Sequence, residues 1–348
     1  MAENTVSSTT APQAEPEPAE PQQRRQRFWS TLARFFLRRR EASIIIIAIA
    51  LLIYFQSSNS DFLSVDGVRT LFQYVAATAI IAAGEVMLLI CGEIDLSAGQ
   101  VSALAPIIMY FAFQNAGLPL WVSIIVGLLV SAAVGLLNGS VTVFLKVPSF
   151  ITTLGTLFLL NGINLTITNG TPVIIPQVDS TFNAVMGNAG FSEIIWAVAI
   201  VIVMQIILSF TRWGLYTVAA GGNLLGASET GVNVKAIKLS NFMLTSLLGG
   251  FAGILEAFRV QSIDPLAGGT PIMFAAVAGA VIGGTALAGG SGTIVGALLG
   301  TLVISIIKDG LTFIGVNANT FDLILGAAIL VAMIVNVRLQ VLREAGRQ

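Results

Sequence analysis

Long runs of apolar residues, separated by short polar or glycine-rich stretches, dominate the chain from residue 41 onward. A helix needs about 20 mostly apolar residues to cross the hydrocarbon core of a bilayer. The runs are continuously apolar rather than alternating, which favours helices over the strands of a barrel. The predicted fold class is therefore all-α, a polytopic helical membrane protein with about ten transmembrane helices. The predicted spans cover residues 41–56, 69–91, 97–115, 119–140, 149–168, 193–211, 239–260, 271–288, 293–309 and 319–337.

Composition supports a protein that is surrounded by lipid, and it removes several kinds of chemistry. Of the 348 residues, 55% are hydrophobic and only 10% are charged, and the mean hydropathy is +0.88. Soluble domains carry about 25% charged residues, so this chain has too little polar surface to face water. Histidine is absent, and the single cysteine, Cys91, excludes an internal disulfide. We therefore expect no metal site and no catalytic residues.

The sequence predicts polar segments at both ends of the chain and an apolar transmembrane domain between them. Residues 1–23 are rich in Pro, Glu, Ser and Thr and predict a disordered N-terminal tail. Residues 24–40 combine seven of the 17 Lys and Arg residues with Phe and Trp, as in an amphipathic helix at the cytoplasmic headgroups. Because this basic cluster adjoins the first apolar run, it favours membrane lipid over nucleic acid as its partner. A transmembrane domain is predicted over 41–337 and a cytoplasmic C-terminal tail over 338–348.

The positions of the basic residues predict the orientation in the membrane. With the N-terminus in the cytoplasm, the loops on that side contain Lys146 and then Arg212, Lys235 and Lys238. The opposite side holds Arg69 near a span end, and Lys308 is the basic residue that fits this arrangement poorly. An excess of positive charge on the inside places both termini in the cytoplasm.

Glycine makes up 35 of the residues and recurs at a spacing that favours close packing of helices. Small residues four positions apart let helix backbones approach in lipid, where no hydrophobic drive brings helices together. The spacing predicts a tight bundle or a dimer face, and a hinge role stays open as the alternative. The pairs are Gly135/Gly139, Gly249/Gly253, Gly279/Gly283 and Gly296/Gly300.

A polar interruption at residues 91–100, with the sequence CGEIDLSAGQ, contains two carboxylates, Glu93 and Asp95. An ionised carboxylate inside a bilayer is costly, so such residues usually face protein or a water-filled path. Two interpretations stay open here. One is a cytoplasmic loop in which the Ser97 hydroxyl caps the next helix. The other is a helix broken near 92–97 that lines a polar conduit.

Further polar side chains are scattered along the predicted spans, where each needs a partner or water. We expect interhelical hydrogen bonds to satisfy most of them. Together they suit a path for a neutral, hydroxyl-rich solute, because amides and hydroxyls can replace its hydration shell. The set comprises Glu85, Asn138, Asn161, Asn164, Gln205, Asn241, Glu256 and Arg259.

The segment 212–238 is the most informative of the predicted cytoplasmic loops. Gly221-Gly222-Asn223 can form a turn, and Leu224–Thr230 can form a short helix with Gly231 at its C-terminal cap. A short helix that projects into the cytoplasm suits a partner protein. None of the four lysines is followed by Ser or Thr, so the chain lacks a P-loop. An ATP-driven function would therefore need another subunit.

Four segments in order along the chain resemble the membrane permease subunit of ribose-type (simple-sugar) ABC importers. They are GEIDLSAGQVSALA at 92–105, GLLNGSVTVFLKVPSFITTLGT at 135–156, GGNLLGASETGVNV at 221–234 and GGTALAGGSGTIVGALLG at 283–300. The resemblance implies a transport subunit rather than an enzyme, which carries a small sugar of the pentose or hexose type into a bacterial cell across the cytoplasmic membrane. It also implies three partners: an ABC subunit that binds ATP and magnesium, a periplasmic or lipoprotein sugar-binding protein, and a second permease, either identical or related.

The resemblance also assigns roles to individual residues. Gly221, Gly222, Asn223, Glu229 and Gly231 match the loop whose short helix docks onto the ATPase, and Lys235 follows directly after it. Asp95 and Ser97 match the broken-helix motif near the transport path. This sequence departs from the family pattern at Glu93, where a second glycine is common, and at Gly226, where alanine is more frequent. The candidate pathway residues are Glu93, Asp95, Ser97, Asn138, Phe150, Asn161 and Asn164.

Two other functions stay open on the sequence alone. An ion-coupled secondary transporter would use Glu85, Glu93 or Asp95, although it leaves the segment 221–234 without a role. A permease of the same family for nucleosides or for a signalling furanose would carry similar motifs. The sequence does not identify the sugar, because selectivity in such importers rests largely on the binding protein.

Overall fold

A computed structural model of the protein describes residues 40–176, 180–266 and 269–317, together with residues 320, 321, 323, 324, 326, 327, 329–331 and 334. The chain divides into two units, residues 1–39 and residues 40–348, and the description below concerns the second. The predicted disordered tail, the basic segment up to residue 39 and the C-terminal tail lie outside the described residues.

Nine apolar helices account for most of the described chain, and they match the first nine predicted spans. The tenth prediction, residues 319–337, is described at ten positions between 320 and 334, nine of which are α-helical. Six helices are long and apolar enough to cross a membrane: α3 (Val65–Ile90), α5 (Leu120–Phe144), α6 (Ser149–Thr168), α8 (Ser192–Phe210), α11 (Val234–Val260) and α13 (Ile294–Phe313). Three shorter apolar helices are α2 (Arg40–Ser58), α4 (Ala98–Gln114) and α12 (Gly269–Ile282). The prediction of an all-α polytopic membrane protein is thus confirmed.

Several elements that connect these helices are too short to produce a periodic pattern in the sequence. Two helices, α9 (Arg212–Gly222) and α10 (Leu224–Glu229), occupy most of the segment predicted as a loop. Helix α7 (Ser180–Asn183) and a π-helical turn, η1 (Ala184–Asn188), follow α6. Strands β1 (Val173–Ile174) and β2 (Ser262–Ile263) pair antiparallel, with Val173 opposite Ile263.

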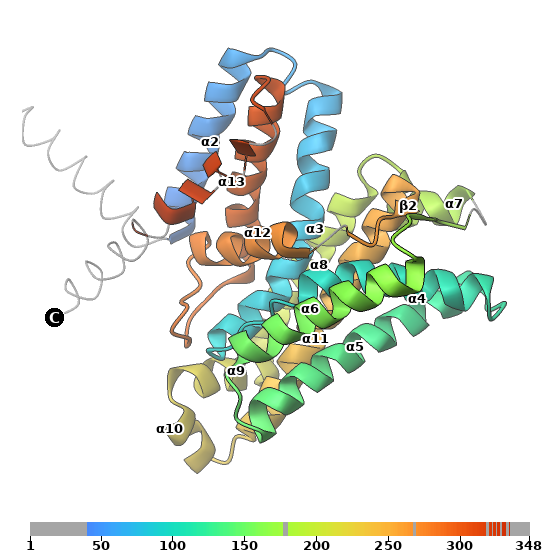
Figure 1. Cartoon of the computed structure of the whole chain (residues 1–348). Coiled ribbons are helices and arrows are strands. Elements are labelled where there is room, and N and C mark those ends of the chain that lie inside the picture. The colour runs from blue at the N-terminus through green and yellow to red at the C-terminus, as the bar shows by residue number, and fades with distance from the viewer. Residues whose placement is uncertain are drawn as a thin grey trace, which may run out of the picture. The chain divides into compact units, whose positions relative to one another are not determined.

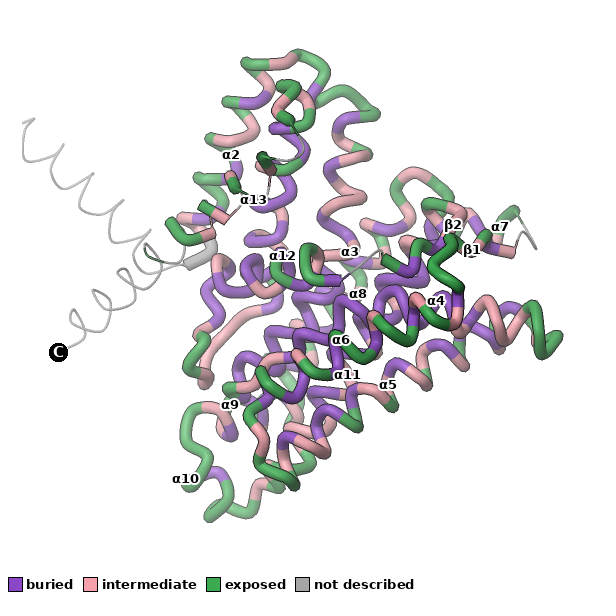
Figure 2. Tube along the Cα trace, in the orientation of Figure 1, coloured by how far each residue is buried: buried purple, intermediate pink, exposed green. Residues whose placement is uncertain are grey.

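Helix α11 lies at the centre of the bundle, where it packs against α5, α3 and α4. Helix α13 packs against α12, α3 and α2 (Figure 1). Buried residues concentrate along α3 and α4, whereas green, exposed segments recur along α5 and α6 (Figure 2). Leu129 of α5 and Phe158 of α6 are 64% and 67% exposed. Large apolar side chains on an outer face are what lipid contact requires.

Glycine pairs bring the helix backbones together, as their spacing predicts. A Cβ added at Gly253 of α11 would lie 1.7 Å from the Ser102 carbonyl oxygen of α4. A Cβ at Gly135 of α5 would lie 2.4 Å from the Phe242 carbonyl oxygen of α11. At Gly300 of α13 the same distance, to the Gly279 carbonyl oxygen of α12, is 2.0 Å. Only glycine fits these crossings, so the interpretation as a tight bundle is confirmed.

Replacing Gly300 by alanine should therefore destabilise the protein. The added methyl group would force α12 and α13 apart, at a cost of about 1–3 kcal/mol for overpacking. Gly162→Ala is the matched control, because this helical glycine on α6 has nothing within 4 Å of its added Cβ. Thermal unfolding in detergent should show a lower midpoint for G300A and no loss for G162A. Equal midpoints would contradict the close packing of α12 on α13.

Candidate functional site

The chain between α3 and α4 leaves the helical path inside the packed protein. Helix α3 ends at Ile90, and Gly92 adopts a positive φ of 74°, which turns the backbone away from the helix axis. Asp95 and Ser97 follow, and both are 0% exposed. Helix α4 begins one residue later, at Ala98. The protein therefore covers the polar residues of this break, which is not a solvated loop.

Asp95 is held by four hydrogen bonds from three side chains and one backbone group. Its Oδ1 accepts from the Ser97 backbone N–H at 2.9 Å, from the Ser97 hydroxyl at 2.6 Å and from Asn138 Nδ2 at 3.2 Å. Its Oδ2 accepts from the Ser246 hydroxyl at 3.0 Å. The expected cap is therefore wrong: Ser97 precedes α4, but its hydroxyl makes no cap bond, because it donates to Asp95.

The same cluster joins the break to three helices. Asn138 of α5 donates to the Ser97 hydroxyl at 2.8 Å and accepts from the Thr156 hydroxyl of α6 at 2.7 Å. Ser246 belongs to α11. We call Asp95, Ser97, Asn138, Thr156 and Ser246 the Asp95 cluster. Because its donors and acceptors satisfy one another, the cluster fixes the break against α5, α6 and α11.

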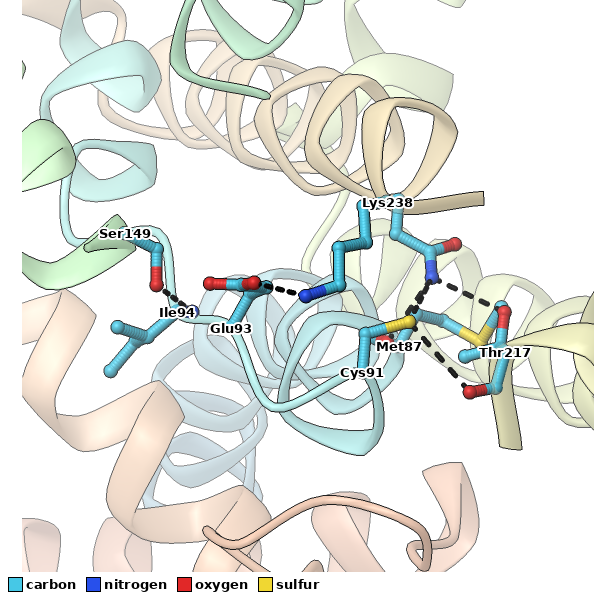
Figure 3. A network of polar contacts seen from close by, with 8 residues as sticks. Met87, Cys91, Glu93, Ile94, Ser149, Thr217 and Lys238 are labelled. Atoms are coloured by element: carbon cyan, nitrogen blue, oxygen red, sulfur yellow. Dashed lines mark hydrogen bonds and ion pairs between the residues drawn. The ribbon is translucent and has the colours of Figure 1, made fainter. Parts of the chain in front are cut away.

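Glu93 leaves the break in another direction and forms an ion pair with Lys238 of α11 (Figure 3). Both side chains are mostly buried, at 12% and 15% exposed. The next residue, Ile94, donates its backbone N–H to the Ser149 hydroxyl at the start of α6, at 3.3 Å. The break is thus anchored at each of its polar residues.

A second buried cluster surrounds Asn241 of α11 at the end of α3. Its Nδ2 contacts the Met87 carbonyl oxygen at 3.3 Å, the Cys91 sulfur at 3.2 Å and the Thr217 hydroxyl at 3.2 Å. The Trp213 indole N–H donates to Asn241 Oδ1 at 2.8 Å. Figure 3 shows Cys91, Met87 and Thr217 close together, with the Cys91 sulfur 3.7 Å from the Thr217 carbonyl oxygen. This cluster attaches α9 to the end of α3, close to the break.

The other predicted pathway residues lie apart from the Asp95 cluster. Asn164 of α6 is fully buried and donates to the Gln100 side-chain oxygen of α4 at 3.3 Å. Gln100 in turn donates to Asn161 Oδ1 at 3.5 Å. Phe150, in the first turn of α6, is 50% exposed and belongs to neither cluster. The structure therefore brings together Asp95, Ser97 and Asn138, and separately Asn161 and Asn164.

Interhelical hydrogen bonding, expected for the scattered polar residues, is confirmed for several of them besides these. Gln205 of α8 accepts with its side-chain oxygen from the backbone N–H groups of Ile294 and Val295, at 2.9 and 3.1 Å. It thereby caps the start of α13 from a neighbouring helix. Arg259 forms ion pairs with Glu193 of α8, at 3.3 Å, and with Glu256.

A cavity of about 390 Å³ lies among α3, α4, α11, α12 and α13. None of the predicted pathway residues lines it. Its polar lining includes Glu256 and Arg259, which the sequence identified as needing partners, and residues that it did not identify. Single polar positions in an apolar helix carry no periodic signal, so only the packing reveals that they converge. The missed polar residues are Gln73, Tyr74, Thr78, Ser102, Ser262, Asp264, Ser305 and Lys308.

Helix α10 forms as predicted and is capped at both ends. The Asn223 side-chain oxygen accepts from the Gly226 backbone N–H at 2.9 Å, which satisfies one free N–H of the first turn. Beyond the last turn, Gly231 has φ 87°, and its N–H bonds the Ser228 carbonyl at 3.0 Å. The Val232 N–H bonds the Ala227 carbonyl at 3.0 Å, which completes a Schellman motif.

The expected turn at Gly221-Gly222-Asn223 is wrong, because both glycines belong to the last turn of α9. The reason is a backbone contact. A Cβ at Gly221 would lie 1.6 Å from the Ile90 carbonyl oxygen, so a helix can pass this close to the end of α3 only with glycine there. The same Ile90 oxygen accepts a hydrogen bond from the Gly290 N–H at 2.8 Å.

Helix α10 exposes two leucines alongside Ser228 and Glu229. Leu224 and Leu225 are 48% and 73% exposed, although the helix is held firmly by its caps. Lys235, in the first turn of α11, places its ammonium 5.8 Å from the ring centre of Phe144 at the end of α5. Among the residues that the structure describes, no group of three or more Cys, Asp or Glu side chains could hold a metal ion. The described residues thus include a short capped helix with exposed leucines and a cavity of about 390 Å³.

Comparison with known proteins gives one family and several relatives. The family model described as "Branched-chain amino acid transport system / permease component" matches residues 68–333. The chain is 38% identical to the xylose/arabinose import permease protein XylH of Sulfolobus acidocaldarius over 308 residues, which are 86% of this chain and 85% of XylH. It is 34% identical to the ribose import permease protein RbsC of Haemophilus influenzae, over 87% of this chain and 94% of RbsC. Identity to the autoinducer 2 import system permease protein LsrC of Photorhabdus luminescens is 31%, over 86% and 91% of the two chains. No solved structure matches.

Substitution of Asp95 should test whether its carboxylate holds the break in place. Asp95→Ala leaves the Ser97, Asn138 and Ser246 donors without their acceptor, at about 1–3 kcal/mol for each unsatisfied group. Asp95→Asn keeps an oxygen toward Asn138 and Ser97, and its amide can donate to the Ser246 hydroxyl. We expect D95A to lose folded protein in detergent, as seen by size exclusion, and D95N to retain it. A folded, stable D95A protein would contradict the role of this cluster in holding the break.

Proposed function

Since the chain belongs to the family of permease components matched over residues 68–333, we propose that it forms the membrane path for a small neutral sugar. It is the permease component of an ABC importer, a transport subunit rather than an enzyme. Membership in this binding-protein-dependent family implies an ATPase partner and a binding-protein partner. ATP and magnesium are expected on the ATPase, not on this chain.

The substrate class that we propose is a pentose-type sugar, and a furanose signal is the alternative. This choice is supported by the relatives, whose names specify xylose and arabinose, ribose, or autoinducer 2. The description of the family model names branched-chain amino acids instead. The neutral amides of the Asn161–Gln100–Asn164 group favour a hydroxylated solute over a charged one. Transport is directed inward.

Helix α10 is the observation that carries the proposal. It is short, capped at both ends and presents Leu224 and Leu225 at the surface, which suits a helix that another protein grips. We propose that the segment 212–238 is the coupling loop. In it, Gly221, Asn223 and Gly231 shape the helix, Glu229 completes its last turn, and Gly222 and Lys235 flank it.

We further propose about ten transmembrane helices, with a broken helix at 92–97 and both termini in the cytoplasm. Basic residues support this orientation. Lys146 follows the C-terminal end of α5, and Lys235 lies at the start of α11, just after α10; the Lys235 ammonium is close to Phe144 of α5. The permease domain would extend over 41–337, between a disordered tail at 1–23 with a lipid-binding segment at 24–40 and a C-terminal tail at 338–348. The exposed apolar faces leave room for a second permease, identical or related.

The candidate pathway residues keep two roles in this proposal. Asn161 and Asn164 are amides that a sugar hydroxyl can contact, and Phe150 offers an exposed aromatic face about three turns away, at the start of the same helix. Glu93, Asp95, Ser97 and Asn138 would act by holding the break in place, since their polar atoms are bonded within the protein.

Purification of the native complex tests the proposal directly. Mild extraction from native membranes, followed by mass spectrometry, should recover a P-loop ATPase at equal stoichiometry with the permease. Reconstituted vesicles should then take up ribose or xylose only with ATP and the binding protein. Uptake that continues without ATP and stops when an ion gradient is dissipated would overturn the proposal in favour of a secondary transporter.

Breaking α10 should abolish uptake without disturbing the membrane domain. Glu229→Pro removes a backbone N–H and its ring clashes with the preceding turn, which costs a helix about 3 kcal/mol. Glu229→Ala is the matched control, because alanine at the same position preserves the helix. We expect normal insertion for both variants, ATP-dependent uptake for E229A and none for E229P. Normal uptake by E229P would contradict the coupling assignment.

The contact beneath α10 gives a second test. Gly221→Ala must displace α9 from the Ile90 carbonyl, whereas an added Cβ at Gly222 would meet its nearest atom, the Gly290 Cα, at 3.9 Å. We expect G221A to bind the ATPase but hydrolyse ATP without uptake, and G222A to behave like the natural protein. Equal uptake by the two variants would show that the contact between α9 and the Ile90 carbonyl does not couple ATP hydrolysis to transport.

A further inference from the structure

Three of the polar side chains that line the cavity among α3, α4, α11, α12 and α13 have no hydrogen-bond partner in the described part of the chain. Among the described residues, the side chains of Gln73, Ser262 and Ser305 make no hydrogen bond to one another or to any other group, and all three line the cavity. Ser305 is only 3% exposed. Gln73 and Ser262 are half-buried, and the polar atoms of all three residues can bond to water or to a hydroxylated ligand in the cavity.

We propose that this cavity is a binding station for a neutral sugar within the permease itself. The inference rests on the proposed function and adds a site to it: the sugar would rest here between the binding protein and the cytoplasm. Its volume, about 390 Å³, lies within the range of about 300–1,000 Å³ that is typical of small-molecule sites. The lining combines the three unpaired groups with apolar walls from residues such as Ala103, Ile272 and Leu311. Such walls suit the C–H faces of a sugar ring.

Four charged side chains also line the cavity: Glu256, Arg259, Asp264 and Lys308. Arg259 is engaged by Glu193 and Glu256, so its guanidinium is already compensated. The Lys308 ammonium lies 4.5 Å from the ring centre of Tyr74. Neutral hydroxyls need only the donors and acceptors that Gln73, Ser262 and Ser305 supply.

The position of the cavity suits a station on an inward path. Its lining on α11 lies from Ala252 onward, in the half of the helix remote from α10. The β1–β2 pair and the start of α12 adjoin it at the same end. On the orientation proposed above, this end faces the binding protein, so a released sugar would meet the cavity first.

Thiol protection can test the site, because the natural chain has one cysteine, Cys91, which is buried. We would introduce Ser305→Cys in the cavity and, as a matched control, Ser60→Cys in the exposed turn between α2 and α3. The permease–ATPase complex in lipid nanodiscs would be treated with a small methanethiosulfonate reagent, with ribose, xylose or leucine present. We expect one of the two sugars to slow modification of S305C several-fold, and leucine to have no effect on it. None of the three solutes should affect modification of S60C.

Several outcomes would overturn the binding station. They are an S305C thiol that never reacts, one that no sugar protects, one that leucine protects instead, or equal protection of S60C. Gln73→Ala provides a second measurement that does not depend on the cysteine variant. It should raise the sugar concentration at half-maximal uptake several-fold and leave the maximal rate unchanged, and an unchanged concentration would contradict the site. These failures differ from failure of the proposed function, in which the natural complex shows no ATP-dependent sugar uptake.

Discussion

A helix that stops inside a lipid bilayer leaves backbone and side-chain polar groups that water cannot reach, so the protein must satisfy them itself. The break after Ile90 meets this constraint with the Asp95 cluster. Asp95 accepts four hydrogen bonds, and its partners come from the break itself, α5 and α11, with Thr156 of α6 bonded in turn to Asn138. The arrangement of these helices therefore depends on one buried carboxylate. An apolar residue at this position could not hold the same three elements.

Lengths and positions of the membrane helices were predictable because lipid imposes one simple rule on every span. The prediction of 149–168 coincides with α6, and the glycine spacing correctly located the crossings of α4, α5 and α11. The capped helix α10 was also predictable, since Asn223 and Gly231 are local signals whose geometry does not depend on distant residues.

The partners of each polar side chain were not predictable, because they come from helices distant in the sequence. Ser97 has the composition of an N-cap, but Asp95 lies two residues away and competes successfully for its hydroxyl. Gly221 and Gly222 look alike in the sequence, and only the approach of Ile90 distinguishes them. The cavity is the extreme case, since Gln73 and Ser305 are isolated polar residues on separate apolar helices.

The long helix α11 connects the features that the proposed function needs. Beginning just after α10, it carries Lys238, Ser246 and Gly253 in turn, which contact Glu93, Asp95 and the Ser102 backbone. Its last turns supply Glu256 and Arg259 to the cavity. Its 27 residues span about 40 Å at 1.5 Å per residue, and they contain no proline that would let the helix kink. Under the proposed function, this one helix therefore links α10, where the ATPase would bind, to the break and to the cavity.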